Sequence, residues 1–127
     1  MNTGLLEHVN MTVSDPDRTA AMLVDLFGWK VRWRGPSKDN GLTVHVGTDA
    51  AYVALYTHAP LNALSSQSYD IVGSVNHLGI LVDDLAAAEE RIVASGIETH
   101  SHQVYDPGAR FYFHDHDGIE YEVVSYA

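Results

Sequence analysis

The stretches EHVNMTVSD (residues 7–15) and NHLGILVDD (residues 76–84) are two versions of one pattern. In each, a histidine (His8 or His77) heads an alternating run that ends, seven residues later, in an aspartate. Alternation with a period of two predicts a β-strand that buries one of its faces. Because this strand pattern occurs twice in the sequence, we expect an internally repeated fold.

The residues that follow each stretch extend the repeat. Asp15 can cap a helix that Gly28 ends, and Asp84 can cap a second helix that Gly96 ends. Between the caps, apolar residues recur at helical spacing: Met22, Leu23, Leu26 and Phe27, then Leu85, Ala88, Ile92 and Val93. Three strand-like runs follow each helix, at 29–35, 41–48 and 51–57 and at 98–105, 110–116 and 119–126.

These elements predict a single α+β domain over residues 1–127. It comprises a βαβββ module at 4–58, a polar linker at 59–74 and a second βαβββ module at 75–127. We expect the two modules to form a curved, mostly antiparallel, eight-stranded sheet around a concave site, with a helix outside each half.

The amino-acid composition limits the classes of binding partner that we expect. The chain has 127 residues, and its 7 Lys and Arg against 17 Asp and Glu give a formal net charge of −10. Such a surface repels phosphate backbones, so we expect no nucleic-acid partner. There is no cysteine, no apolar run of membrane-spanning length and no secretion signal. We therefore expect a cytoplasmic protein without a membrane partner.

Aligning DAAYVALYT (residues 49–57) with DGIEYEVVS (residues 117–125) places Ala54 opposite Glu122. The repeat thus predicts four equivalent positions, occupied by His8 and Ala54 in one module and by His77 and Glu122 in the other. Two imidazoles and one carboxylate suit Fe(II), Mn(II), Zn(II), Ni(II) or Co(II), and three ligands leave positions open for substrate. The plainer interpretation is two ordinary strand histidines and a solvated acid.

The quoted stretches, together with DLFGWKV (residues 25–31) and FYFHDHDGIEYEVV (residues 111–124), resemble the vicinal oxygen chelate superfamily. This family includes glyoxalase I, extradiol dioxygenases, fosfomycin-resistance enzymes and bleomycin-binding proteins. The resemblance implies that His8, His77 and Glu122 hold a divalent metal in a concave site that takes a small-molecule substrate. Relatives cover their sheet edges and apolar faces by pairing, so we expect a homodimer.

The resemblance also favours some enzymatic activities of the superfamily over others. Ala54 stands where glyoxalase I carries a fourth ligand, which disfavours that isomerase. The ten-residue spacing from Tyr112 to Glu122 is similar to the extradiol dioxygenase signature, in which His102 would also serve. We therefore favour an Fe(II) dioxygenase, with Tyr56, His102 and Tyr112 as substrate-binding candidates and no catalytic residue named.

Other activities of the family stay open. Asp106 would repel a phosphonate, so a fosfomycin transferase is disfavoured. The alternatives are a protein that binds a bleomycin-like drug without turnover and a glyoxalase-type lyase or isomerase.

Overall fold

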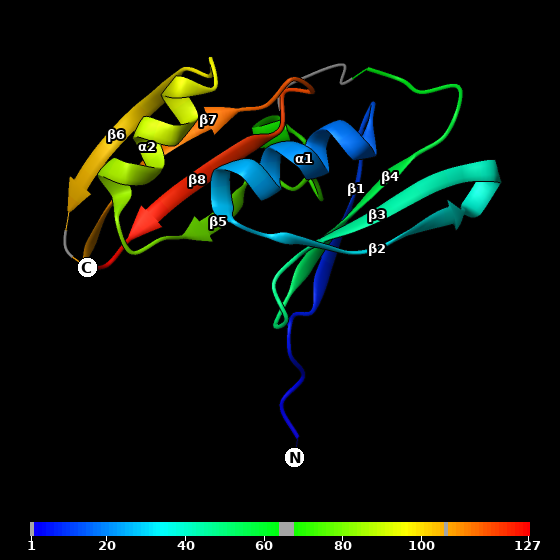
Figure 1. The fold of residues 1–127 in the computed structure, drawn as a ribbon, viewed down its shortest axis with the longest axis horizontal. Coiled ribbons are helices and arrows are strands. Elements are labelled where there is room, and N and C mark those ends of the chain that lie inside the picture. The colour runs from blue at the N-terminus through cyan, green and yellow to red at the C-terminus, as the bar shows by residue number, and fades with distance from the viewer. Residues whose placement is uncertain (1, 64–67, 106) are drawn as a thin grey trace. The chain divides into compact units, whose positions relative to one another are not determined.

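The computed structural model describes residues 2–63, 68–105 and 107–127. These residues form eight strands and two α-helices, which are labelled in Figure 1. In chain order the elements are β1 (His8–Thr12), α1 (Pro16–Phe27), β2 (Lys30–Ser37), η1 (Lys38–Asn40), β3 (Gly41–Gly47), β4 (Tyr52–Thr57), η2 (Ser68–Asp70), β5 (Leu78–Leu81), α2 (Leu85–Ala94), β6 (Thr99–Tyr105), β7 (Gly108–His114) and β8 (Glu120–Ser125). None of the helices in these ranges is long and apolar enough to cross a membrane.

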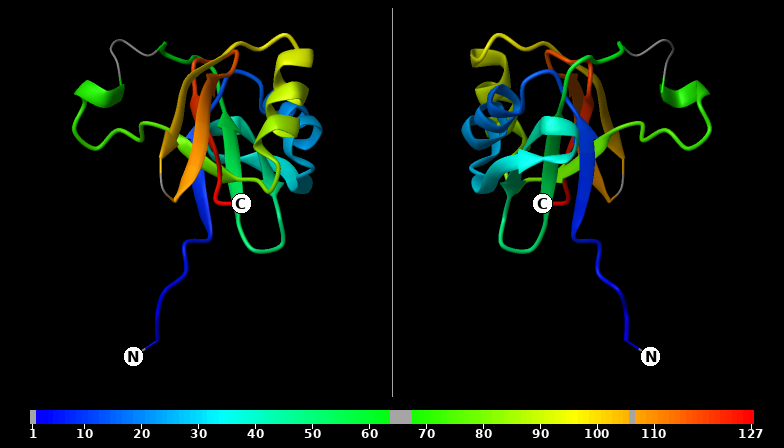
Figure 2. Two further views of the ribbon diagram at one scale, coloured as in Figure 1. Left: turned by 90° about the vertical axis from the view of Figure 1, so that its left-hand side faces the viewer. Right: turned by 90° about the vertical axis from the view of Figure 1, so that its right-hand side faces the viewer.

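The chain divides into two compact units, Met1–Asn62 and Ala63–Ala127, and each unit contains one βαβββ set. The predicted α+β class and internal repeat are confirmed. The strands form two four-stranded sheets, ordered β1-β4-β3-β2 and β5-β8-β7-β6, where the sequence had predicted one eight-stranded sheet. Each sheet is mixed, because its first strand pairs in parallel with its last and the other pairs are antiparallel. The β2–β3 and β6–β7 hairpins can be followed in Figure 2.

Both helices begin and end where capping chemistry predicts. The Asp15 carboxylate accepts a hydrogen bond from the Arg18 N–H at 3.2 Å, and Gly28, at φ +69°, donates its N–H to the Val24 carbonyl. The Asp84 carboxylate likewise accepts from the Ala87 N–H at 3.0 Å.

Each helix packs one face on its own sheet. In α1, Leu23 and Leu26 are buried, and the helix contacts β3 and β4. In α2, Ala88 and Ile92 are buried, but Val93 is 54% exposed. Including Val93 in the packed face was therefore wrong, because a turn of about 100° per residue carries it past the side that meets β6 and β8.

Strand alternation divides each sheet into a covered face and an open face. In the first unit, four buried residues of β3 and β4 point to the covered face: Val44, Val46, Val53 and Leu55. The residues that alternate with them point to the open face, where Thr43 and Ala54 are also buried: Thr43, His45, Tyr52, Ala54 and Tyr56. In the second unit, Phe111, Phe113, Tyr121 and Val123 are fully buried. Tyr112, Glu120 and Glu122 alternate with those residues and so share the open face.

Strand register supports the alignment of the two modules. Ala54 and Glu122 hold equivalent positions, each between the first and third strands of its sheet. Ala54 pairs with Asn10 on β1 and His45 on β3, and Glu122 pairs with Gly79 on β5 and Tyr112 on β7.

Two glycines begin the equivalent strands β3 and β7 and allow close backbone approach. A Cβ on Gly108 would overlap the Ser125 carbonyl oxygen and lie 2.7 Å from a ring carbon of Tyr126. We therefore expect Gly108→Ala to lower the free energy of unfolding by about 1–3 kcal/mol.

Urea unfolding of the Gly108→Ala variant measures this effect. Gly79→Ala is the matched control, because a Cβ there meets nothing within 4 Å and the backbone is not left-handed. Its free energy of unfolding should stay within about 0.5 kcal/mol of the parent protein. Equal losses in the two variants would contradict the close approach at Gly108.

Candidate functional site

His77 and Glu122 come together on the open face of the second sheet. His77 immediately precedes β5, and Glu122 lies on the adjacent strand β8. The Nε2 atom of His77 is 3.0 Å from Oε1 of Glu122, and the two side chains are 30% and 12% exposed. The structure therefore brings this histidine and this carboxylate together within one unit.

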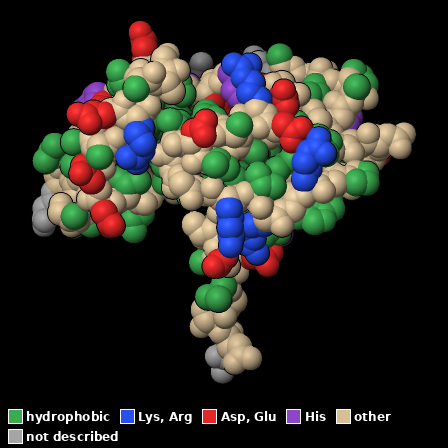
Figure 3. Space-filling view, in the orientation of Figure 1, with side chains coloured by type: hydrophobic (Ala, Val, Ile, Leu, Met, Phe, Trp, Pro, Cys, Tyr) green, Lys and Arg blue, Asp and Glu red, His purple; other side chains and the backbone are tan. Residues whose placement is uncertain are grey.

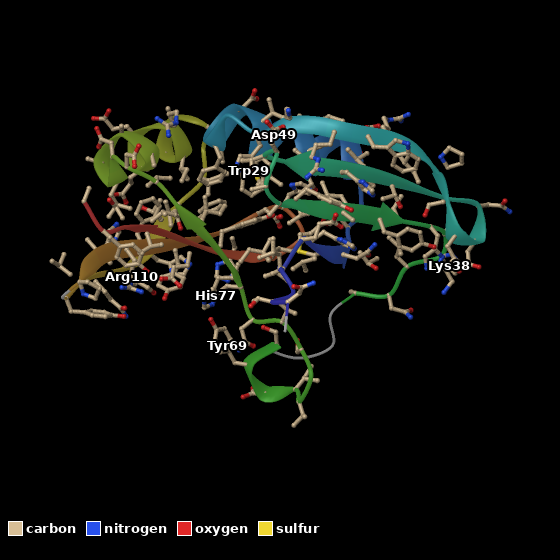
Figure 4. The ribbon with its side chains drawn as sticks, turned by 90° about the horizontal axis from the view of Figure 1, so that it is seen from below. Trp29, Lys38, Asp49, Tyr69, His77 and Arg110 are labelled. Atoms are coloured by element: carbon tan, nitrogen blue, oxygen red, sulfur yellow. The ribbon has the colours of Figure 1, made fainter. Side chains whose placement is uncertain are left out.

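A tyrosine from the segment between the modules contacts the other nitrogen of His77. The Tyr69 hydroxyl lies 3.0 Å from His77 Nδ1 and donates its hydrogen to Glu120 Oε1. Figure 4 shows Tyr69 beside His77. Since a hydroxyl has one hydrogen, the Tyr69 oxygen can only accept from Nδ1. A proton on Nδ1 would thus have an acceptor in Tyr69, and Nε2 is the nitrogen of His77 that faces Glu122.

Arg110, also labelled in Figure 4, holds the other oxygen of Glu122. Its Nη1 donates to Glu122 Oε2 at 2.8 Å, and both side chains are largely buried, at 13% and 12% exposed. The Arg110 guanidinium also lies 4.5 Å from the ring centroid of Tyr105, in a cation–π contact. The contact with Arg110 thus fixes the orientation of the Glu122 carboxylate, whose other oxygen, Oε1, faces His77.

The donor geometry of His77 and Glu122 fits a divalent metal. Two donors that lie about 2.1 Å from one ion, at about 90° to each other, are about 3.0 Å apart. Nε2 and Oε1 have this separation, and the remaining ligand atoms are held by Tyr69, Glu120 and Arg110. Metal-ligating imidazoles and carboxylates usually have their second atoms hydrogen-bonded in this way.

The position of the two glutamates depends on the turn between β7 and β8. The Asp115 carboxylate accepts from the N–H groups of Asp117 and Ile119, at 2.9 and 3.0 Å, and from the buried Tyr121 hydroxyl at 2.8 Å. The Asp115–Gly118 region is therefore a structural turn, built from residue types that turns favour. It fixes the register that pairs Tyr112 with Glu122.

Tyr112 stands next to His77 on the same open face. The two rings meet edge to face, with centroids 5.5 Å apart, and the ring of His100 stacks on Tyr112 with centroids 6.2 Å apart. Burial raises the pKa of the Tyr112 hydroxyl, so it keeps its proton at neutral pH. It is thus a hydrogen-bond donor beside the histidine.

His8 begins the equivalent strand of the first unit. Its Nδ1 pairs with Glu7 Oε1 at 2.9 Å, and its ring stacks on Tyr52 at 4.9 Å. Tyr52 in turn stacks on His45, which contacts Trp33 at 5.1 Å. The open face of the first sheet is therefore a row of aromatic and imidazole rings.

An open depression of about 570 Å³ lies on this face of the first unit. Its lining residues come from β1, β2 and β3: Asn10, Trp33, Ser37, Thr43 and His45. Burial lowers the pKa of His45, so its ring is neutral at neutral pH. Planar aromatic groups are the ligands that such a surface favours.

The remaining sequence candidates are distributed between the units. The Tyr56 hydroxyl donates to the Lys38 carbonyl at 2.8 Å, within the first unit. His102 pairs with Glu89 of α2, and its role toward substrate stays a prediction. His8 belongs to the first unit, so its convergence with His77 and Glu122 is also a prediction. Asp106 lies outside the described residues.

Sequence reasoning missed three residues that support the pair. Glu120 lies two residues before Glu122 and Arg110 lies two before Tyr112, so strand alternation alone places them on the open face. Tyr69 carried no such signal, because it lies in a polar segment without periodicity.

Charge on the surface is mixed. In Figure 3, most of the Lys and Arg side chains in view have Asp or Glu side chains nearby. Ion pairs in the first unit join Arg34 to Asp17, at 2.8 Å, and Lys30 to Asp49.

Comparison with known proteins identifies the class. The family model described as Glyoxalase/Bleomycin resistance protein/Dioxygenase superfamily matches residues 5–123, and the chain belongs to this superfamily. No curated protein matches the chain.

Solved structures share the fold at low sequence identity. A glyoxylase/bleomycin resistance protein/dioxygenase domain from Frankia sp. EAN1pec has a TM-score of 0.81 and 23% identity, over 98% of each chain. The fosfomycin resistance protein FosX from Listeria monocytogenes, complexed with Mn(II) and sulfate, has a TM-score of 0.74 and 20% identity, over 98% of this chain and 93% of that one. TioX from Micromonospora sp. ML1 has a TM-score of 0.69 and 20% identity, over 98% and 100%.

The contact between Tyr69 and Glu120 makes a prediction about alkaline pH. The hydrogen bond to Glu120, aided by burial, raises the pKa of Tyr69 from 10.0 to about 12. The stability that this raised pKa contributes is present below pH 10 and is lost as pH rises through about 12. We therefore expect Tyr69→Phe to be less stable than the parent at pH 9, with the difference shrinking toward pH 12.

Ultraviolet titration of the tyrosines tests the cause directly. Subtracting the Tyr69→Phe curve from the parent curve isolates Tyr69. Glu120→Gln should move this titration to lower pH, because an amide carries no negative charge. An unchanged titration would contradict the assigned hydrogen bond.

Proposed function

We propose that this protein is a metal-dependent enzyme that acts on a small organic substrate through two neighbouring oxygen atoms. His8, His77 and Glu122 are the proposed protein ligands. The observation that carries the proposal is the His77–Glu122 pair, whose Nε2 and Oε1 lie 3.0 Å apart while their other atoms are held by Tyr69 and Arg110. The Mn(II) in the FosX structure supports a divalent ion in this fold.

When bound, a divalent metal supplies positions for two vicinal oxygens and a positive charge that stabilises developing negative charge. Two imidazoles and one carboxylate suit non-haem Fe(II) most closely, with Mn(II), Zn(II), Ni(II) and Co(II) as other candidates.

The chain's own residues orient the proposed metal ligands and can donate a hydrogen bond to the substrate. Tyr69 holds the proton of His77 on Nδ1, so Nε2 keeps its lone pair in neutral imidazole. Arg110 fixes Glu122 Oε2 and offsets its charge. Tyr112, protonated at neutral pH, can donate a hydrogen bond to a substrate oxygen beside His77.

The proposed substrate is a catechol-like compound, and the proposed reaction is oxygen-dependent ring cleavage of the extradiol type. Ala54 occupies the position of a possible fourth ligand, and its 2% exposure leaves it as part of the packed sheet. The rings of Trp33, His45 and Tyr52 favour a planar aromatic group. Tyr112 lies beside the His77–Glu122 pair, as the extradiol interpretation requires.

A second candidate is a binding protein for a planar drug, without turnover. The open depression on the first unit, lined by Trp33 and His45, favours it. A glyoxalase-type lyase or isomerase is a third candidate, which the hydrophobic Ala54 disfavours.

The deciding assay loads metal-stripped protein anaerobically with Fe(II) and adds a panel of catechols. We expect oxygen uptake and a yellow ring-opened product. Retained metal without oxygen uptake would discard the dioxygenase alone. Protein that retains no divalent metal, yet binds planar aromatics in calorimetry, would favour the binding protein.

Ligand variants test the proposed metal set. His8→Ala, His77→Ala and Glu122→Gln should each lose Fe(II) and oxygen uptake while staying folded, because none of the three side chains belongs to the apolar core. His58→Ala and Glu90→Gln are the controls and should retain metal. A His8→Ala variant with full metal content would remove His8 from the ligand set.

Tyr69→Phe tests the proton placement on His77. Loss of the hydroxyl that accepts from Nδ1 should weaken metal binding about 10- to 100-fold without removing a ligand. Competition with a chelator of known affinity measures the change. An unchanged affinity would show that Tyr69 does not orient His77.

We also propose that the protein is a cytoplasmic homodimer. Apolar side chains remain exposed in both units, including Leu5, Val72 and Val104 at 89%, 103% and 88%. Light scattering at micromolar concentration should give the mass of two chains, and a monomer mass would contradict pairing.

A further inference from the structure

We propose that the second unit contains a separate zinc site made by His100, His114 and Glu120. One imidazole nitrogen from each histidine and one carboxylate oxygen all lie within 4.8 Å of one another. The three residues come from the adjacent strands β6, β7 and β8, so a single sheet positions all of them. The site shares no ligand with the proposed function, because it uses neither His8, His77 nor Glu122.

The contacts among the three residues have the spacing of metal donors. His114 Nε2 lies 3.3 Å from Glu120 Oε2, and His100 Nε2 lies 3.0 Å from His114 Nδ1. Two donors about 2.0 Å from one tetrahedral ion are about 3.3 Å apart. The two contacts use different nitrogens of His114, so only one of them binds the shared ion, and the 48% exposed ring is open to solvent.

A backbone irregularity directs His100 toward this cluster. In a regular strand, His100 and His102 would share a face. The register between β6 and β7 shifts between His100 and Gln103, and Ser101 adopts a left-handed φ of +57°. Consequently His100 meets Tyr112 and His114 on the open face, while His102 pairs with Glu89 of α2. Bulges that re-aim a side chain often lie beside functional sites.

The ligating atoms are already oriented. Ser101 Oγ lies 2.9 Å from His100 Nδ1, which leaves Nε2 on the side of His114. Glu120 uses Oε1 for Tyr69 and Oε2 for His114, so one carboxylate can support His77 and bind the second ion. Two imidazoles and one carboxylate, accessible to solvent, are a ligand set that Zn(II) accepts.

This cluster has no counterpart in the first unit. By strand register, Trp33, Gly47 and Tyr52 occupy the positions of His100, His114 and Glu120. The first-unit positions offer no imidazole and no carboxylate. The cluster is therefore specific to the second module, unlike His8 and His77, which the repeat duplicates.

Zinc stoichiometry in defined variants tests the site. The full chain is stripped of metal, dialysed against zinc, freed of excess and measured by mass spectrometry, with cobalt absorption as a second readout of imidazole coordination. We expect two equivalents in the parent, one in His8→Ala/Glu122→Gln, and one in His100→Gln/His114→Gln. All four substitutions together should leave none.

Controls separate this proposal from the proposed function. His102→Gln, on the same strand but facing α2, should not change the stoichiometry. If His8→Ala/Glu122→Gln removes no zinc but His100→Gln/His114→Gln does, the second site stands and the proposed ligand set fails. If His100→Gln/His114→Gln binds as much zinc as the parent, with unchanged cobalt absorption, the second site is overturned. Glutamine at these surface positions should leave the fold intact, which circular dichroism checks.

Discussion

The register between β7 and β8 is the constraint on which the candidate site depends. A single carboxylate, that of Asp115, binds two N–H groups of the turn and the hydroxyl of the buried Tyr121. A slip of one residue would move Glu120 and Glu122 into the packed face and bring Tyr121 and Val123 out. Removing the unpaired carboxylates from water would cost several kcal/mol each. The turn therefore decides which side chains face His77.

The same physics explains why the two faces of each sheet differ so sharply. A helix covers one face, and its apolar residues meet strands whose alternate positions are buried. The uncovered positions are free to carry polar groups, because water or neighbouring side chains satisfy them. Rings gather there in the first unit, and carboxylates, imidazoles and Arg110 gather there in the second. One scaffold thus presents two chemically different open surfaces.

Hydrogen-bond connectivity links the residues of the second surface. His100 contacts His114, His114 contacts Glu120, and Glu120 contacts Tyr69. Tyr69 then reaches His77, which faces Glu122 and, through it, Arg110. A change in Glu120 should consequently affect both proposed metal sites, whereas a change in His100 should affect only one.

The sequence by itself determined the repeat, the helix caps, the alternation of the strands and the equivalence of Ala54 with Glu122. Each of these depends on local periodicity or on a residue's own backbone preference, and both can be recognised in the local amino-acid sequence. The sequence also placed His77 and Glu122 on one face, because alternation and repeat alignment sufficed.

Only the tertiary structure decided the rest. Pairing of the strands in two sheets of four follows from hydrogen bonds between distant segments, which no local pattern specifies. Tyr69 reaches His77 from a segment without periodicity, and the irregularity at the left-handed Ser101 puts His100 and His102 on different faces. Such contacts depend on how the backbone bends in space, so they became visible only when the strands were assembled.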